Sequence, residues 1–288
     1  MKNFALKVAY IGYKFYGFQR QPDFRTIEGE IIDTLMDLGL INGIKESKFS
    51  IAGRTDKGVH SLGNVISFQS EKEPFINQIN NHLDEDIQII AKSSVHFGFK
   101  PRYPLMRHYR YFLKDFHDDD LDVSSLKELA KLFKGTHDFT NFTKRNQRMP
   151  IRKINKVNVC DIKKDNETLI YVDVFGKSFL WNMVRNMMAV FRDVGKGKLE
   201  IDDINDYFNP SFNTNIRALA PENLILMDSY YKNVNFKYDD YALERFKRVL
   251  EENILEYKRK CFSRTNILFS LLDKEKLHFS NFKNDLLK

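Results

Sequence analysis

The sequence is poor in cysteine, and this scarcity excludes several kinds of protein. Its two cysteines, Cys160 and Cys261, lie far apart, and neither has a Cys or His partner at the spacing of zinc ligands. So few cysteines in 288 residues exclude a disulfide-stapled scaffold and favour a reducing compartment. Apolar runs of membrane-spanning length are also missing, and the chain starts in a strand pattern rather than a signal peptide. We therefore expect a cytoplasmic protein with no membrane contact and no metal site.

Acidic residues are outnumbered by basic ones. The 46 Lys and Arg residues against 39 Asp and Glu residues give a formal net charge of +7. Such an excess favours a polyanionic partner, although many basic proteins bind none. Hydrophobic residues make up 42% of the chain, enough for a sizeable core, and aromatic residues make up 14%. Phe and Tyr suit both a core and the stacking of unpaired bases.

Charge is concentrated in one octet, Gly53-Arg54-Thr55-Asp56-Lys57-Gly58-Val59-His60. The stretches on both sides have the pattern of short strands, so we expect the octet to form a loop between two strands. Gly53 and Gly58 allow a tight turn and the close approach of a ligand. Asp56 beside Arg54 is then a positioned, ionised carboxylate. Taken alone, the octet also fits a polar turn that carries a salt bridge.

The octet resembles the signature Gly-Arg-Thr-Asp-x-Gly-Val-His of the tRNA pseudouridine synthase A family at every fixed position. Lys57 stands where the family usually has Ala. Similar stretches continue along about residues 1–230. They are the loop Gly12–Gln21, the run Phe99–Arg102 followed by Arg107-His108-Tyr109-Arg110-Tyr111, the run Asp138-Phe139-Thr140-Asn141-Phe142, and Phe179-Leu180-Trp181-Asn182-Met183-Val184-Arg185-Asn186-Met187.

The expected elements follow one order twice: strand, helix, strand, strand, helix, strand, which is the split βαβ order of a ferredoxin-like unit. The first set is a strand at Phe4–Tyr10, a helix after Thr26, two strands around the octet, a short helix after Pro74 and a strand at Ile87–Phe97. The second is a strand at Arg107–Phe116, a helix from a capping box at Ser125 to Gly135, strands at Ile154–Ile162 and Thr168–Phe175, an apolar helix at Ser178–Val194 and a strand at Asn223–Tyr231.

We therefore expect an α+β fold. The resemblance implies two ferredoxin-like halves, at residues 1–104 with the Asp56 loop and at residues 105–232. Their sheets join into one antiparallel or mixed sheet flanked by helices, with a cleft between the halves. Residues 233–288 form a helical C-terminal extension outside the resemblance. An appendage of the body and a separate RNA-binding arm both fit its mixture of Leu, Glu and Lys.

The resemblance also implies site residues. Asp56 is the catalytic nucleophile, and Arg185 is the cation beside it. Arg185 is an isolated charge in an apolar helix and needs a partner there, since a buried unpaired guanidinium is costly. We expect Arg54 to help hold Asp56 ionised, and Tyr109 to stack on the uracil and take part in removing the C5 proton. The plainer alternatives are an arginine that braces the fold and a pair of core tyrosines on a strand.

Eight further residues are predicted to contact RNA, because cations suit phosphate while rings and amides suit bases. They are Arg20, Gln21, Lys57, His60, Lys144, Arg145, Arg148 and Arg152. For His60, a structural role or a phosphate contact is favoured over a role as a base. The basic run from Lys144 to Arg152 also fits a solvated surface.

The function implied by the resemblance is a tRNA pseudouridine synthase, which isomerises uridine in the anticodon arm, at positions 38 to 40. The resemblance further implies a homodimer that cradles one tRNA. The reaction involves no redox change and no group donor, so no cofactor is expected. Two alternatives remain at this point: a non-catalytic tRNA-binding or folding protein on the same scaffold, and a metal-dependent nucleic-acid hydrolase, for which the sequence offers no clustered carboxylate or His motif.

Overall fold

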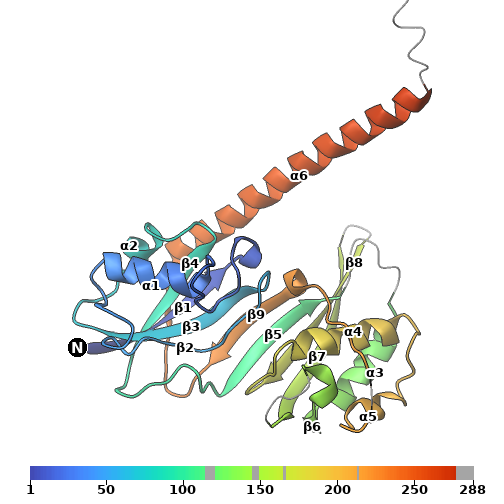
Figure 1. Cartoon of the computed structure of the whole chain (residues 1–288), viewed down its shortest axis with the longest axis horizontal. Coiled ribbons are helices and arrows are strands. Elements are labelled where there is room, and N and C mark those ends of the chain that lie inside the picture. Colours follow the sequence, from blue (N-terminus) through green and yellow to red (C-terminus); the bar gives the residue numbers. More distant parts are fainter. Residues whose placement is uncertain (114–120, 145–148, 165–166, 213, 277–288) are drawn as a thin grey trace, which may run out of the picture. The chain divides into compact units, whose positions relative to one another are not determined.

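The computed structural model describes residues 1–113, 121–144, 149–164, 167–212 and 214–276. The chain divides into two compact units, Met1–Ala242 and Leu243–Lys288. The fold is α+β: one large sheet, mostly antiparallel, flanked by helices, and a long C-terminal helix (Figure 1). Within the described residues, no helix is both long and apolar enough to cross a membrane.

In the part of the chain that the structure describes, the sheet has ten strands in the order β10-β4-β1-β3-β9-β5-β8-β7-β6, with β2 paired to β3 beside this path. The N-terminal half contributes β1 (Lys2–Tyr10), α1 (Ile27–Asp37), β2 (Ser50–Ile51), β3 (His60–Ser70), α2 (Ile76–Asn80) and β4 (Ile87–Val95). The C-terminal half contributes β5 (Met106–Phe112), α3 (Val123–Phe133), β6 (Gly135–Asp138), β7 (Ile151–Lys164), β8 (Glu167–Gly176), α4 (Met183–Gly195), α5 (Ile204–Tyr207) and β9 (Leu224–Tyr230). The two-residue strand β10 (Lys237–Tyr238) returns to the edge at β4.

The first helix forms where the sequence predicts it. The Thr26 side chain caps α1 by accepting a hydrogen bond from the Gly29 N–H at 3.3 Å. Ile27, Ile31 and Leu35 recur at helical spacing and are buried against the sheet. The chain then leaves the helix through Gly39, which has a positive φ of 60°.

Two helix starts differ from the prediction. The capping box at Ser125 is wrong, because α3 begins at Val123 and the Asp122 carboxylate caps it by accepting from the Ser124 N–H at 2.9 Å. The apolar helix expected from Ser178 begins at Met183, since Asn182 adopts left-handed backbone angles (φ 57°) that a helix does not continue through. This late start has consequences for the site described below.

The two halves join where β3 and β9 run parallel, with only His60↔Ile225 and Ser61↔Leu226 paired. Ser61 also pairs with Tyr10 on β1, so Tyr10, Ser61 and Leu226 point to one side of the sheet. Tyr10 belongs to the core under α1 and α2, and Leu226 to the core under α3 and α4. The helices of both halves therefore cover the same face of one continuous sheet (Figure 1).

The second unit consists, within the described residues, of the greater part of helix α6 (Asp240–Lys276). Every residue from Ile254 to Leu271 is exposed, including the large apolar side chains of Ile254, Leu255, Phe262, Ile267, Leu268, Phe269 and Leu271. Within the described residues, the predicted extension 233–288 contains the short strand β10 and the single long helix α6.

Candidate active site

The octet forms the connection from β2 to the start of β3, and three contacts fix its backbone. The Phe18 N–H donates to the Thr55 carbonyl at 3.0 Å, and the Thr55 hydroxyl lies 2.8 Å from the buried hydroxyl of Tyr10. The Asn64 side-chain amide donates to the Gly53 carbonyl at 3.1 Å. Asp56 is therefore held on a loop whose residues just before it are anchored to the core.

The carboxylate of Asp56 meets two side chains from the C-terminal half. Oδ2 lies 3.5 Å from the guanidinium of Arg185, and Oδ1 accepts a hydrogen bond from the indole N–H of Trp181 at 3.1 Å. The Asp56 side chain is 34% exposed, whereas that of Arg185 is 15% exposed. In the described structure Asp56 pairs with Arg185 and not with Arg54, which is exposed to solvent. The acid thus faces outward while its cationic partner is largely buried.

Arg185 is fixed by contacts other than the acid. Its Nε donates to the Leu219 carbonyl at 2.7 Å, and its Nη1 donates to the side-chain oxygen of Asn182 at 2.9 Å. Asn182 is the residue with left-handed backbone angles just before α4. Such angles cost about 1 kcal/mol or more in a residue other than glycine, and they cluster at functional sites. Here they turn Trp181 toward Asp56 and aim the Asn182 amide at Arg185.

Tyr109 lies in the core beside this group. It is 8% exposed, and its ring meets the ring of Phe179 edge-on at 5.0 Å. Burial raises the pKa of the Tyr109 hydroxyl, Arg107 opposes this, and the negative charge of Asp56 raises it further. The structure therefore brings Asp56, Arg185 and Tyr109 into one neighbourhood, and Tyr109 carries a neutral hydroxyl there.

The loop after β1 packs against the octet. The ammonium of Lys57 lies 4.4 Å from the ring centre of Tyr16, which itself stacks on Phe24 with ring centres 4.0 Å apart. Both aromatic rings are more than 40% exposed. His60 accepts the Gly12 N–H at 2.9 Å through Nδ1, and burial lowers its pKa, so it is a neutral acceptor at neutral pH. A side chain in place of Gly12 would collide with the Val59 carbonyl, so the two loops touch backbone to backbone.

The same loop carries Arg20 and Gln21. Arg20 is exposed, and its backbone N–H donates to Glu28 at 2.7 Å. The Gln21 side chain donates to the Tyr16 carbonyl at 3.0 Å. The Arg20 guanidinium thus points to solvent, whereas the Gln21 amide braces the loop that presents the exposed Tyr16 ring.

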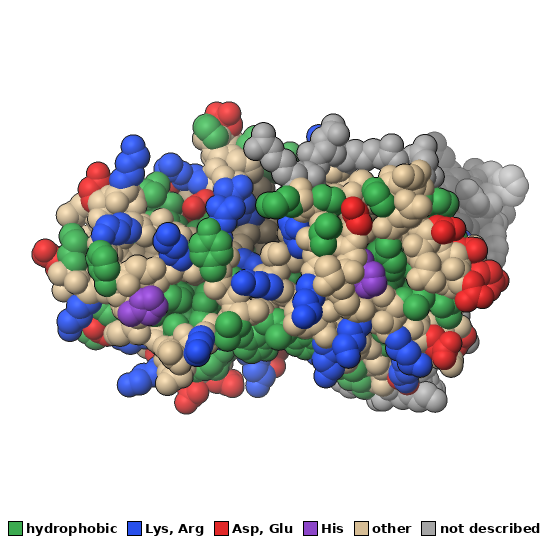
Figure 2. Space-filling model, turned by 90° about the horizontal axis from the view of Figure 1, so that it is seen from below, with side chains coloured by type: hydrophobic (Ala, Val, Ile, Leu, Met, Phe, Trp, Pro, Cys, Tyr) green, Lys and Arg blue, Asp and Glu red, His purple; other side chains and the backbone are tan. Residues whose placement is uncertain are grey.

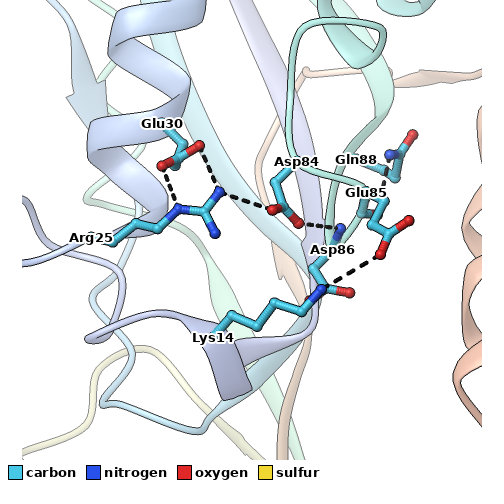
Figure 3. Close-up of polar contacts among 7 residues, drawn as sticks. All are labelled: Lys14, Arg25, Glu30, Asp84, Glu85, Asp86 and Gln88. Atoms are coloured by element: carbon cyan, nitrogen blue, oxygen red, sulfur yellow. Dashed lines mark hydrogen bonds and ion pairs between the residues drawn. The ribbon is translucent and has the colours of Figure 1, made fainter.

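Ion pairs tie the two ends of this loop to the turn before β4 (Figure 3). Arg25 binds Glu30 on α1 and Asp84, at 2.7 and 2.8 Å. Lys14 binds the buried Asp86 at 2.9 Å, which raises the pKa of Lys14. The loop with its exposed rings is therefore held between the octet on one side and this charged turn on the other.

The predicted basic run is described only in part. Lys144 is exposed, and the Arg152 guanidinium donates to the backbone carbonyls of Met149 and Ile151 at 2.6 and 2.8 Å. Arg145 and Arg148 lie outside the described residues. Figure 2 shows Lys and Arg side chains spread across the middle of one face, with most of the Asp and Glu side chains toward its periphery.

The structure shows a recess of about 270 Å³, which lies away from Asp56. Its lining includes Lys48, Phe99, Lys100, Arg102 and Tyr103. The predicted cleft between the halves therefore stays a prediction. The part of the chain that the structure describes contains no group of three or more His, Cys, Asp or Glu side chains able to hold a metal ion.

The sequence did not predict a role for two residues of the site. Trp181 and Asn182 stand inside the stretch that resembles the family, but only Arg185 was singled out there. The one signal for Trp181 is that it is the single tryptophan of the chain. Asn182 carries no signal, since its backbone angles and its contact with Arg185 arise only in the folded protein.

Comparisons with known proteins identify the family. A family model described as "tRNA pseudouridine synthase" matches residues 129–232, and together with the relatives that follow it places the chain among the pseudouridine synthases, a class of isomerases. The tRNA pseudouridine synthase A of Methanobrevibacter smithii is 53% identical over 96% of this chain and 100% of its own length. That of Methanothermobacter thermautotrophicus is 44% identical over 92% and 94%. The chain belongs to the tRNA pseudouridine synthase A family.

Among solved structures, a "Cbf5-Nop10-Gar1 Complex" matches 66% of this chain and 44% of its own chain at 12% identity. The TM-score is 0.33, which is too low to inform either fold or function.

Proposed function

We propose that this pseudouridine synthase acts on uridines in the anticodon arm of tRNA, with Asp56 as its nucleophile. The observation that carries the proposal is the meeting of Asp56, from a loop of the N-terminal half, with Arg185, from a helix of the C-terminal half, at 3.5 Å. A carboxylate can act as a nucleophile, and the positive charge of Arg185 stands beside this one. The exposure of Asp56 leaves it accessible to a nucleotide that has been extruded from its stack.

The proposed reaction is balanced without any added reagent. An oxygen of Asp56 attacks C1′ of the uridine, and the N1–C1′ bond breaks with its electron pair left on the uracil. The uracil turns, C5 bonds to C1′, and the carboxylate is released. Loss of the C5 proton and protonation of N1 complete an isomer of the starting nucleotide. Attack at C6, or assistance to a glycal intermediate, is the alternative use of the same carboxylate.

Tyr109 is assigned to the base rather than to the sugar. Its ring lies beside the Asp56 neighbourhood and suits stacking on the flipped uracil. Because burial raises its pKa, the Tyr109 hydroxyl stays protonated at working pH. In this proposal it therefore acts near C5 as a neutral hydroxyl, and not as a phenolate base.

The RNA path is proposed from exposed cations and rings. Arg20, Lys57 and Lys144 are exposed, and Lys57 lies on the stacked Tyr16–Phe24 pair next to Asp56. Cations beside open aromatic faces suit unpaired nucleotides, which stack on rings while the phosphates meet the charges. The proposed set of RNA contacts is completed by Gln21, His60 and Arg152, with Arg145 and Arg148 outside the described residues. Arg54 remains proposed as a catalytic partner of Asp56.

Other features remain proposals that rest on the family. They are modification at positions 38 to 40, a homodimer that cradles one tRNA, and a cytoplasmic location. We also propose that residues 1–104 and 105–232 are two ferredoxin-like halves, each with the strand order fourth-first-third-second, and that residues 233–288 are a separate extension. The orders β4-β1-β3-β2 and β9-β5-β8-β7 support this.

The decisive experiment maps pseudouridine in bulk tRNA incubated with the wild-type protein and with Asp56→Asn. The synthase proposal expects new pseudouridine in the anticodon arm with the wild type and none with the variant, while both bind tRNA. A tRNA-binding or folding protein on this scaffold would bind tRNA without product, and Asp56→Asn would change nothing. A metal-dependent hydrolase would cleave RNA and lose that activity on addition of a chelator.

A further inference from the structure

Trp181 touches the reactive acid but has no part in the mechanism above. Its indole N–H donates to Oδ1 of Asp56 at 3.1 Å, while Arg185 lies beside Oδ2 at 3.5 Å. Each carboxylate oxygen thus has its own partner, and the two partners approach from different residues. Two-point contact of this kind fixes the rotation of a carboxylate about its Cβ–Cγ bond, which a single partner leaves open.

The turn that presents Trp181 is itself constrained. The Thr143 hydroxyl donates to the Trp181 carbonyl at 2.8 Å, and the next residue, Asn182, is held in left-handed backbone angles. The side chain of Trp181 is nevertheless 50% exposed. A large apolar ring is normally placed by burial, whereas this half-exposed ring is directed by its backbone turn and by its hydrogen bond to Asp56. The orientation of the Trp181 ring therefore depends on its hydrogen bond to Asp56.

We propose that Trp181 is a positioning residue for the nucleophile: its N–H holds Oδ1 so that Oδ2, beside Arg185, faces the sugar of the substrate. This rests on the proposed role of Asp56. An indole N–H donates hydrogen bonds but neither gives up nor accepts a proton at neutral pH, so Trp181 orients the acid and does no acid–base chemistry. Its contribution is a hydrogen bond to a charged group, a kind of bond that is stronger than one between neutral groups.

The kinetic test compares Trp181→Phe, which keeps a flat ring and removes the N–H, with Trp181→Leu, which removes both. Loss of one hydrogen bond to a charged group corresponds to a fall in kcat of roughly tenfold to a hundredfold. We expect both variants to show this fall, with unchanged affinity for tRNA and an unchanged melting temperature. Phe75→Leu is the matched control, since Phe75 is an exposed ring (61%) under the Lys92 ammonium in the N-terminal half. It should keep wild-type kcat and KM.

Wild-type kcat in Trp181→Phe together with a loss in Trp181→Leu would overturn the inference, because the ring rather than the N–H would then matter. Weaker tRNA binding with unchanged kcat in both variants would also overturn it. Asp56→Asn, measured in the same assay, distinguishes failure of the nucleophile proposal from failure of the positioning role of Trp181. If Asp56→Asn is inactive and Trp181→Phe is fully active, only the role of Trp181 fails. If Asp56→Asn is active, the nucleophile proposal fails and the positioning role with it.

A second readout needs no turnover. Trp181 is the single tryptophan of the chain, so the tryptophan emission of the protein reports on this residue alone. Asp56→Ala removes the acceptor of its N–H, and we expect the emission spectrum of the RNA-free protein to shift, whereas Phe75→Leu leaves it unchanged. An identical spectrum in Asp56→Ala would mean that the contact is absent in solution, and the inference would fall.

Discussion

Two Asp–Arg pairs in this protein differ in how completely the arginine binds the acid and in how exposed the acid is. On β5 and β8, Arg110 holds Asp173 through two hydrogen bonds of 2.8 and 2.9 Å, and the Asp173 side chain is 9% exposed. At the candidate site, Arg185 stands 3.5 Å from Asp56, which is 34% exposed. The first pair is a closed bidentate contact. In the second, the arginine is committed to Leu219 and Asn182, and the acid keeps lone pairs free.

The contrast matches what the proposed role of Asp56 as nucleophile requires. An acid whose two oxygens are both hydrogen-bonded to a guanidinium, such as Asp173, is unreactive and stabilises the sheet. An acid with fewer hydrogen bonds, such as Asp56, keeps oxygen lone pairs open to a substrate, while the neighbouring cation keeps the site positive. The predictions below test this contrast by changing one member of each pair.

The largest effect is expected for Asp56→Asn. The amide has nearly the shape of the acid but no charge and little nucleophilicity, so turnover should fall by roughly a thousandfold or more. Binding of tRNA, measured by filter retention, should remain near the wild-type value because the cations around the loop are untouched. Turnover within tenfold of the wild type would refute the assignment of Asp56 as nucleophile.

Arg185→Lys should give the next largest loss. Lysine keeps the charge, but it cannot reach Leu219, Asn182 and Asp56 together, because it lacks the planar fork of the guanidinium. Loss of these contacts should lower kcat by roughly a hundredfold, as judged by single-turnover assays. Arg110→Lys is the counterpart in the other pair, and it should lower the melting temperature and leave kcat in place.

Tyr109→Phe should have a smaller effect on catalysis. The variant keeps the ring beside Phe179 and loses the hydroxyl, so we expect kcat to fall about tenfold with little change in tRNA affinity. Burial raises the pKa of the Tyr109 hydroxyl above its ordinary value near 10, so it stays protonated through neutral pH. The dependence of kcat on pH between about 6 and 9 should therefore have the same form in both proteins. A basic limb that disappears in the variant would contradict this.

Asp173→Asn should leave kcat unchanged and affect stability alone. Burial raises the pKa of Asp173, but hydrogen bonds from Arg110 and His108 outweigh it and bring the pKa to about 2. Because the pKa is lower in the folded state than in the unfolded state, the pair stabilises the fold above about pH 4, and this stabilisation is lost as pH falls toward 2. We expect the variant to lose about 2 kcal/mol of unfolding free energy at neutral pH.

Urea unfolding across the acid range measures this loss. The difference between wild type and Asp173→Asn should shrink between about pH 4 and pH 2. A difference that stays constant over that range would mean that the Asp173 charge contributes nothing to stability.

The sequence predicted those features that depend on local pattern. The cap at Thr26, the spacing of Ile27, Ile31 and Leu35, and the strand–loop–strand form of the octet are set by neighbours in the chain, and the structure has them where expected. The two-residue strand β10 escaped notice because it exists only through its partner β4. In the α3 region the sequence predicted a capping box at Ser125, whereas the folded backbone uses Asp122 as the cap.

In the site, too, features set by local sequence could be predicted, and features set by the folded structure could not. Asp56 and Arg185 stood out in the sequence because a charge in a glycine-flanked loop and a charge in an apolar helix both need an explanation. Trp181 did not, since a single aromatic residue beside a helix is usually part of a core. Its contact with Asp56 joins residues 125 positions apart, and it depends on the left-handed angles of Asn182. No local pattern contains that information.

The parallel ladder between β3 and β9 has only two residue pairs, and the first of them begins at His60, the last residue of the octet. Asp56 lies on one side of this short seam, and its partners Trp181 and Arg185 lie on the other. A slight widening of the seam would lengthen both contacts at once, without breaking either core. Hydrogen exchange at the backbone amides of this two-pair ladder would report how often β3 and β9 separate beside the candidate site.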